Sequence, residues 1–131
     1  MLILIVEDDP ICGLSVAYAL EEAGHAVIGP ASRQAEALSL AQRFRPQLAL
    51  VDIDLEHPGE GIELARLLRE MDVQSVFVSA QHGVASQNSE LALGLIGKPF
   101  DPEDVPRSVE VVAALMRGAP PPPSPRSLRL F

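Results

Sequence analysis

Four short apolar runs in this chain each lead into polar residues that can take part in chemistry. The pairs are Leu2–Val6 before Glu7 and Asp8, Leu48–Val51 before Asp52, Val76–Val78 before Ser79, and Leu95–Ile96 before Lys98. Runs of this length are typical of strands buried on both faces of a parallel sheet. In an open α/β sheet, ligands bind outside the carboxyl ends of the strands. We therefore expect these polar side chains to meet in one site.

The segments between the runs have helical patterns. Pro10 can open a helix that ends near Glu22, and Ser32 can cap a helix that ends near Phe44. Further helices are expected around Ile62–Met71 and from Asp101 to Met116, and a short second strand at 26–28. Strands that alternate with helices in units of about 25 residues indicate a parallel sheet with helices on both faces. The sequence thus predicts an α/β fold with a doubly wound, five-stranded parallel sheet.

Residues 80–97 have the weakest pattern in the chain. They contain Gly83, Gly94 and Gly97 and the polar run 86–89, so any helix there is expected to be short.

The length of 131 residues predicts one folded domain, which we assign to residues 1–118. Residues 119–131 read APPPPSPRSLRLF, and four consecutive prolines cannot continue a helix and favour polyproline II. We expect a disordered tail. The alternative is a docking peptide on a semi-rigid spacer, with Leu128, Leu130 and Phe131 as apolar anchors.

Charge and hydropathy exclude several classes of partner. The net charge is −8, and an acidic surface repels phosphate backbones, so no nucleic-acid partner is expected. No apolar run approaches the roughly 18 residues that span a bilayer, so no membrane contact is expected. Leu2–Val6 is too short for a signal peptide, and the single cysteine, Cys12, fits a reducing compartment. These features predict a cytoplasmic protein.

The expected site is rich in carboxylates. Glu7, Asp8, Asp52 and Asp54 would repel one another at close range unless a cation neutralised them. Mg²⁺ prefers oxygen ligands and binds one or two carboxylates while it retains room for a phosphate. An aspartate can also act as a nucleophile toward phosphorus. Ser79 can donate a hydrogen bond to a phosphoryl oxygen, and Lys98, the only lysine in the chain, can pair with another.

Four segments together resemble the receiver domain of two-component response regulators, over residues 2 to about 117. The segments are Ile3–Asp9 (ILIVEDD), Leu50–Leu55 (LVDIDL), Val76–Ala80 (VFVSA) and Gly97–Phe100 (GKPF). Each one is a weak signal, but all four in order at near-correct spacing form a specific one. The resemblance implies the flavodoxin-like (βα)5 fold.

The resemblance also implies a role for each site residue. Asp52 would be the phospho-acceptor, Asp8 a direct Mg²⁺ ligand, and Glu7 a second acidic residue that acts through metal-bound water. The backbone carbonyl of Asp54 would complete the protein ligands. Two further roles follow: Ser79 would be the switch hydroxyl, and Lys98 the lysine whose following proline is usually cis.

The implied function is signal transduction. The domain would take a phosphoryl group from a histidine of a sensor histidine kinase or a histidine phosphotransfer protein. It would then signal by changed contacts with an unknown downstream protein, or serve as a phosphate sink. Such a domain catalyses its own phosphorylation and dephosphorylation and is not a turnover enzyme.

The sequence departs from the family pattern at two places. Leu95 stands where receivers usually have a tyrosine or phenylalanine that swings inward on phosphorylation. The interval from Ser79 to Lys98 is also shorter than in typical receivers. The shortening resembles a subgroup of single-domain receivers with a degenerate fourth helix, whose signature Ser79-Ala80-Gln81 meets in part.

Three other functions can be compared with the motifs of this sequence. Asp52-Ile53-Asp54 fits the Asp-x-Asp motif of haloacid-dehalogenase phosphatases, although that motif normally lies on the first strand and leaves Glu7 and Asp8 without a role. A flavodoxin-like cofactor carrier would need a phosphate-binding loop after the first strand, which this chain lacks. The third alternative is an inactive receiver that acts only as a binding module.

Because residue 95 has no ring to turn, we expect the signal to leave the site by a change of order in residues 80–97. Contacts from Ser79 and Lys98 to a phosphoryl group would restrain both ends of this glycine-rich segment. Its amides should exchange hydrogen faster than those of the core strands and slow down when beryllofluoride is added. Protection equal to the core strands before activation would contradict this prediction.

Overall fold

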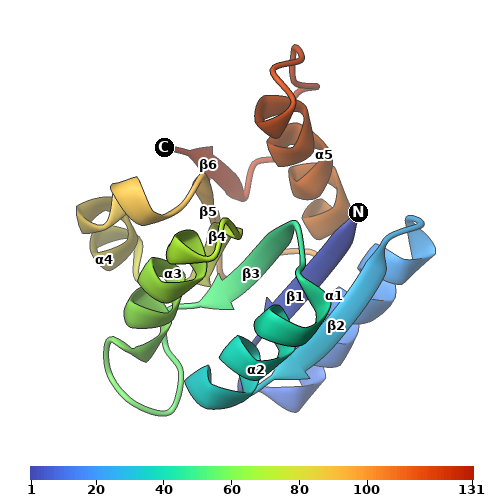
Figure 1. The fold of residues 1–131 in the computed structure, drawn as a ribbon. Helices are drawn as coiled ribbons and strands as arrows, with labels where there is room; N and C mark the ends of the chain where they lie inside the picture. Colours follow the sequence, from blue (N-terminus) through green and yellow to red (C-terminus); the bar gives the residue numbers. More distant parts are fainter.

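A single twisted sheet with helices on both faces forms the body of the protein (Figure 1). The computed structural model describes all residues, 1–131. The elements in chain order are β1 (Leu2–Val6), α1 (Pro10–Glu22), β2 (Ala26–Ala31), α2 (Gln34–Phe44), β3 (Leu48–Asp52), α3 (Glu60–Glu70), β4 (Gln74–Ser79), α4 (His82–Gln87), a 3₁₀ turn (Ser89–Leu91), β5 (Gly94–Gly97), α5 (Asp104–Met116) and β6 (Leu128–Leu130).

The strand order is β2-β1-β3-β4-β5-β6. The first five strands pair in parallel, which confirms the predicted doubly wound parallel sheet. The sheet has six strands rather than the predicted five, because β6 pairs antiparallel with β5.

The sixth strand corrects the expectation for the end of the chain. Residues 119–131 were expected to be disordered, yet Leu128–Leu130 form β6, with Leu128 opposite Ile96 and Leu130 opposite Gly94. Leu128 is only 8% exposed and belongs to the core. Composition around the prolines favours disorder locally and does not specify this long-range pairing. Only the alternative expectation, a docking segment with Leu128 as an apolar anchor, is in line with it. The division of the chain at residue 118 stays a prediction.

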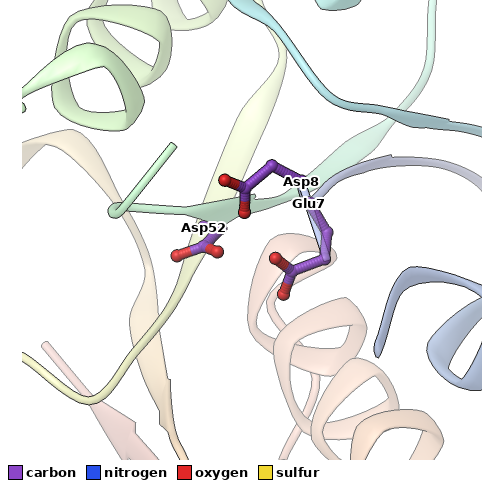
Figure 2. A group of neighbouring side chains, drawn as sticks. All are labelled: Glu7, Asp8 and Asp52. Carbon is purple, nitrogen blue, oxygen red and sulfur yellow. The ribbon is translucent and has the colours of Figure 1, made fainter. Parts of the chain in front are cut away.

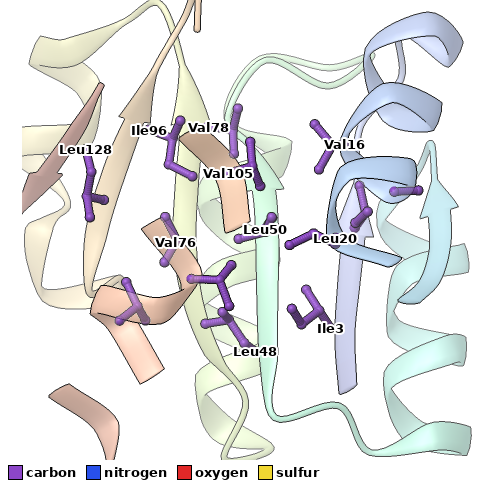
Figure 3. Packing of buried hydrophobic residues seen from close by; sticks show 14 of the residues in the cluster. Ile3, Val16, Leu20, Leu48, Leu50, Val76, Val78, Ile96, Val105 and Leu128 are labelled. Atoms are coloured by element: carbon purple, nitrogen blue, oxygen red, sulfur yellow. The ribbon is translucent and has the colours of Figure 1, made fainter. Parts of the chain in front are cut away.

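The apolar runs form the centre of two cores, one on each face of the sheet. Alternate strand residues such as Ile3 and Leu50 pack under α1 and α5 (Figure 3). The residues between them, such as Leu4 and Val51, pack under α2 and α3. All five residues of β3 are buried, as expected for a central strand covered on both faces. This double burial fixes the position of the strand ends.

The helix starts agree with the sequence in part. The Asp9 carboxylate accepts hydrogen bonds from the backbone N–H of Ile11 (3.0 Å) and Cys12 (3.4 Å) and so caps α1. The predicted Ser32 cap of α2 is wrong. The helix begins at Gln34 without a side-chain cap, and the Ser32 N–H instead donates to the Glu36 carboxylate at 2.9 Å.

The segment between β4 and β5 is short of helix, as predicted. α4 has six residues, and the 3₁₀ turn that follows has three. No helix of the chain has the length and hydropathy needed to cross a membrane.

Candidate functional site

Three carboxylates lie together at the carboxyl ends of β1 and β3 (Figure 2). Glu7 and Asp8 directly follow β1, and Asp52 is the last residue of β3. One oxygen from each carboxylate lies within 4.8 Å of the others. Glu7 and Asp52 are 6% and 3% exposed, whereas Asp8 is open to solvent. The convergence predicted from the sequence is therefore present.

Lys98 is the cation of this cluster. Its Nζ lies 2.7 Å from Oε1 of Glu7 and 3.3 Å from Oδ2 of Asp52. Burial alone would lower the pKa of Lys98, but the hydrogen bond to Glu7 and the charges of Asp52 and Glu7 raise it well above its usual value. Lys98 is therefore a fixed positive charge beside Asp52. The Lys98–Pro99 peptide bond is cis, as the resemblance implied.

The two buried carboxyls have opposite protonation tendencies. Burial, together with the hydrogen bond and the charge of Glu7, raises the pKa of Asp52 to about 7. Burial also acts to raise the pKa of Glu7, but hydrogen bonds with Asp52 and Lys98 outweigh it and lower the value to about 2. Glu7 is thus the ionised partner of Lys98, and Asp52 is the carboxyl that more readily holds a proton when no other cation is near.

Burial, together with the hydrogen bond and charge of Glu7, also raises the pKa of Asp8. Asp8 and Asp52 would therefore lose their protons more readily beside an added cation. Their oxygens are the hard ligands that Mg²⁺ prefers, so this donor set fits a divalent cation.

The Asp54 side chain does not join the carboxylate cluster. Its Oδ2 accepts a hydrogen bond from the Ser79 hydroxyl at 3.3 Å, and its Oδ1 accepts one from the Gln81 side chain at 2.6 Å. The Asp54 N–H donates to Oδ1 of Asp52 at 2.9 Å. The backbone of Asp54 therefore reaches the site while its side chain turns toward β4. A ligand role for its carbonyl remains a prediction.

Ser79 is fully buried at the end of β4 and is oriented by its neighbours. Its hydroxyl donates to Asp54 and accepts from the N–H of Gln81 at 2.8 Å. The Ser79 carbonyl accepts from the N–H of Lys98 at 3.0 Å, so the two residues are directly linked.

Two contacts were not foreseen from the sequence. Gln81 bonds both Ser79 and Asp54, and its only sequence signal is its position two residues after Ser79. Cys12, used in the sequence analysis only as a sign of a reducing compartment, is half-buried beside Glu7. Burial, with a hydrogen bond to Glu7, raises the pKa of the Cys12 thiol to about 12, which keeps it neutral.

Gly61 allows the start of α3 to approach the site. A Cβ at this position would overlap the carbonyl oxygen of Asp52. Only a glycine therefore lets this helix pack against the end of β3.

An apolar surface borders the cluster. A cavity of about 450 Å³ is lined by Lys98, Cys12, Ile11 and Phe100, among others. On α1, Ile11 and Tyr18 are 81% and 66% exposed. Such large exposed side chains beside a reactive group are typical of a protein-binding surface.

Comparison with known proteins identifies the relatives of this fold and site. Residues 3–110 match the family model of the response regulator receiver domain. The chain is 36% identical over 107 residues to the phyllosphere-induced regulator PhyR of Methylorubrum extorquens, covering 79% of this chain and 40% of that protein. It is 25% identical over 119 residues to the transcriptional regulatory protein PdtaR of Mycobacterium tuberculosis, covering 88% of this chain and 58% of that protein. The chain thus spans less than two thirds of the length of either relative.

Solved structures give the same result. The signal receiver domain of a modulated diguanylate cyclase from Desulfovibrio desulfuricans G20 superposes with a TM-score of 0.77 at 30% identity, covering 88% of this chain and 95% of that one. The response regulator PhyR of Brucella abortus superposes with a TM-score of 0.69 at 28% identity, covering 80% and 44%.

The buried carboxyls predict a pH dependence of stability in the metal-free protein. The folded-state pKa of Asp52, about 7, lies above its ordinary 3.8, so its contribution is complete below 3.8 and lost as pH rises through 7. Glu7, lowered from 4.5 to about 2, contributes fully above 4.5 and adds no slope at higher pH. In EDTA, the free energy of unfolding should fall from about pH 5 to pH 7, by at most about 1.4 kcal/mol per pH unit, and level off above pH 7.

Urea unfolding of wild type and Asp52→Asn at several pH values measures this slope. The difference between the two proteins isolates the contribution of the Asp52 carboxyl. Parallel curves for the two proteins would contradict the assigned protonation.

Proposed function

The chain belongs to the response regulator receiver family, and on this premise we propose that it accepts a phosphoryl group on Asp52 from a phosphohistidine. The donor would be a sensor histidine kinase or a histidine phosphotransfer protein. One observation carries the proposal: Asp52 is a buried carboxylate that directly faces both an acidic cluster and the only lysine of the chain. The modification would be the domain's own, without turnover of a free substrate.

Asp8, Asp52 and the Asp54 backbone carbonyl would hold a Mg²⁺ ion, with Glu7 in support. When bound, this ion would neutralise negative charge on the incoming phosphoryl group. The donor set supports this assignment, because three carboxylates with only one ammonium leave an excess of negative charge.

In the transfer, one oxygen of the ionised Asp52 carboxylate forms a bond to phosphorus while the bond from phosphorus to the histidine nitrogen breaks. The nitrogen keeps the bonding electron pair, and the donor leaves as a neutral imidazole because the phosphohistidine ring enters the step with a proton on its other nitrogen. Lys98 already lies 3.3 Å from Asp52 and would pair with a phosphoryl oxygen. Ser79 would have to exchange its hydrogen bond to Asp54 for one to the phosphoryl group.

The apolar surface of α1 supports a protein donor. Ile11, Leu14 and Tyr18 are all more than half exposed and lie on the helix that starts just after Asp8 and Asp9. A helical partner with an apolar face could cover them and present a histidine to the site. The phosphorylated domain would then signal through changed contacts with a downstream protein or drain phosphoryl groups from the donor.

A phosphatase of the haloacid-dehalogenase type is less well supported. In that reading Asp54 would serve as the acid and base beside Asp52. Both oxygens of Asp54 are instead bonded to Ser79 and Gln81, and no role remains for Glu7 and Asp8.

Titration with Mg²⁺ should stabilise the protein, because the ion binds the folded site and not the unfolded chain. At a free concentration one hundred times Kd, the gain is about 2.7 kcal/mol, seen as a higher melting temperature. Asp8→Asn should blunt the response, and Glu63→Gln on the exposed surface of α3 should not. A wild type that does not respond to Mg²⁺ would remove the basis for the metal site.

Acetyl phosphate with Mg²⁺ should add one phosphoryl group to the wild type and none to Asp52→Asn. Asp9→Asn, which changes only the cap of α1, serves as the matched control and should still be labelled. Lys98→Ala should be labelled but lose the conformational response, because its charge acts on the bound phosphoryl group. Intact-mass measurement with peptide mapping gives the number and position of phosphoryl groups in all four proteins.

Retained labelling in Asp52→Asn, mapped to Asp8 or Asp54, would disprove the assignment. Steady hydrolysis of small phosphate esters by the wild type would favour the phosphatase instead.

A further inference from the structure

The end of the chain is bound to the outer edge of β5. The three residues of β6 pair antiparallel with β5, with Arg129 opposite Leu95. Two further backbone bonds frame the pairing, from Gly97 N–H to the Ser127 carbonyl at 2.9 Å and from Phe131 N–H to the Leu93 carbonyl at 3.1 Å. The segment Ser127–Phe131, here called the terminal strand, thus completes the sheet after β5.

Residues on β4 and β5 leave space for this strand and pack against it. A Cβ at Gly94 would lie 2.7 Å from the Arg129 carbonyl oxygen, so a larger residue would push the terminal strand away. Leu128 enters the core beside Ile96 and Val105 (Figure 3). The Phe131 ring packs edge-on against Phe77, with ring centroids 6.4 Å apart and planes at 62°.

Attachment on α5 adds to the fit. The Ser127 hydroxyl donates to the Asp104 carboxylate at 2.9 Å. Side chains on β4, β5 and α5 therefore all contact the terminal strand, which makes the β5 edge a formed binding site for an extended segment.

The terminal strand is nevertheless attached more weakly than the other strands of the sheet. It has only three paired residues, and Leu130 and Phe131 are 36% and 40% exposed. It is joined to α5 through four consecutive prolines, which favour an extended, stiff spacer with no N–H groups to pair. Short edge elements with few buried contacts open at low free-energy cost. The terminal strand can therefore leave while the core remains folded.

The binding edge adjoins the phosphorylation site. Gly97, which bonds Ser127, is followed directly by Lys98, whose Nζ contacts Asp52. Phe77, which contacts Phe131, lies two residues before Ser79. Both residues that would turn toward a phosphoryl group are thus within two positions of a contact with the terminal strand.

We propose that the β5 edge is a binding site for an extended apolar strand, that the terminal strand is its intramolecular occupant, and that phosphorylation of Asp52 loosens this occupant. The last step rests on the proposed function. The hydrogen bond from the Gly97 N–H to the Ser127 carbonyl would be strained when Lys98 shifts toward the phosphoryl oxygens. The freed edge would accept a partner segment of the same chemistry, with a large aliphatic residue where Leu128 lies and an aromatic residue where Phe131 lies.

The test uses a fluorescent peptide that carries residues 124–131, SPRSLRLF, and the full-length protein. Leu128→Asp should release the terminal strand by placing a charge in the core, so this protein should bind the peptide at least tenfold more tightly than the wild type does. Leu115→Asp, the same change at an exposed leucine of α5, is the matched control and should behave as the wild type. Phe131→Ala, which removes only the partly exposed ring, gives a milder release in case Leu128→Asp unfolds.

Beryllofluoride with Mg²⁺ tests the coupling. In the wild type it should raise hydrogen exchange at residues 127–131 at least tenfold and increase peptide binding, and neither change should occur in Asp52→Asn. If neither Leu128→Asp nor Phe131→Ala binds the peptide, the proposed binding site is wrong. Slower exchange around Asp52 on beryllofluoride binding, with residues 127–131 unchanged, overturns the coupling.

The two proposals fail in different ways. If beryllofluoride leaves the Asp52 region unaltered, the proposed function fails and the coupling fails with it. The peptide arm needs no phosphorylation and still decides whether the β5 edge binds a strand.

Discussion

Two buried carboxylates beside a single ammonium are the constraint around which the rest of this protein is arranged. Glu7 and Asp52 are almost inaccessible, and removal of two negative charges from water is costly unless they are paired. Lys98 neutralises one of them, so the site is compensated only in part. Burial and this imbalance together raise the pKa of Asp52, and the excess of negative charge favours a further cation. The same imbalance makes the site responsive, because any group that adds or removes charge must rearrange the lysine.

The parallel sheet makes this cluster possible. Glu7, Asp52, Ser79 and Lys98 come from four strands that are adjacent in the order β1-β3-β4-β5. Each strand is buried on both faces, so its position is fixed by packing rather than by the charges at its end. The apolar cores therefore hold together groups that would otherwise repel one another. Stability lost at the site is offset in the cores, which is the common arrangement for functional sites.

The strands and most residues of the site could be predicted from the sequence, because the signals for them are local. The apolar runs gave the strands, and the residues directly after them gave the site. Contacts that depend on distant partners were missed. Gln81 reaches Asp54 across the strand ends, and Cys12 touches Glu7 from the first turn of α1. Ser32 looked like a helix cap, but Glu36 is bonded to its N–H and the helix starts two residues later.

The end of the chain is the largest miss, and it has a physical explanation. Prolines disfavour helix and sheet locally, but they do not prevent the residues after them from pairing elsewhere. The pattern of β5 contained the complementary evidence: Gly94 has no side chain where the Arg129 carbonyl approaches. The three glycines of residues 80–97 were taken only as a sign of a short helix, whereas one of them, Gly94, admits another strand. Leu95, which lacks the usual ring, lies fully buried on this same strand opposite Arg129. An aromatic ring still lies against this part of the sheet, because Phe131 of the terminal strand packs on Phe77, two residues before Ser79.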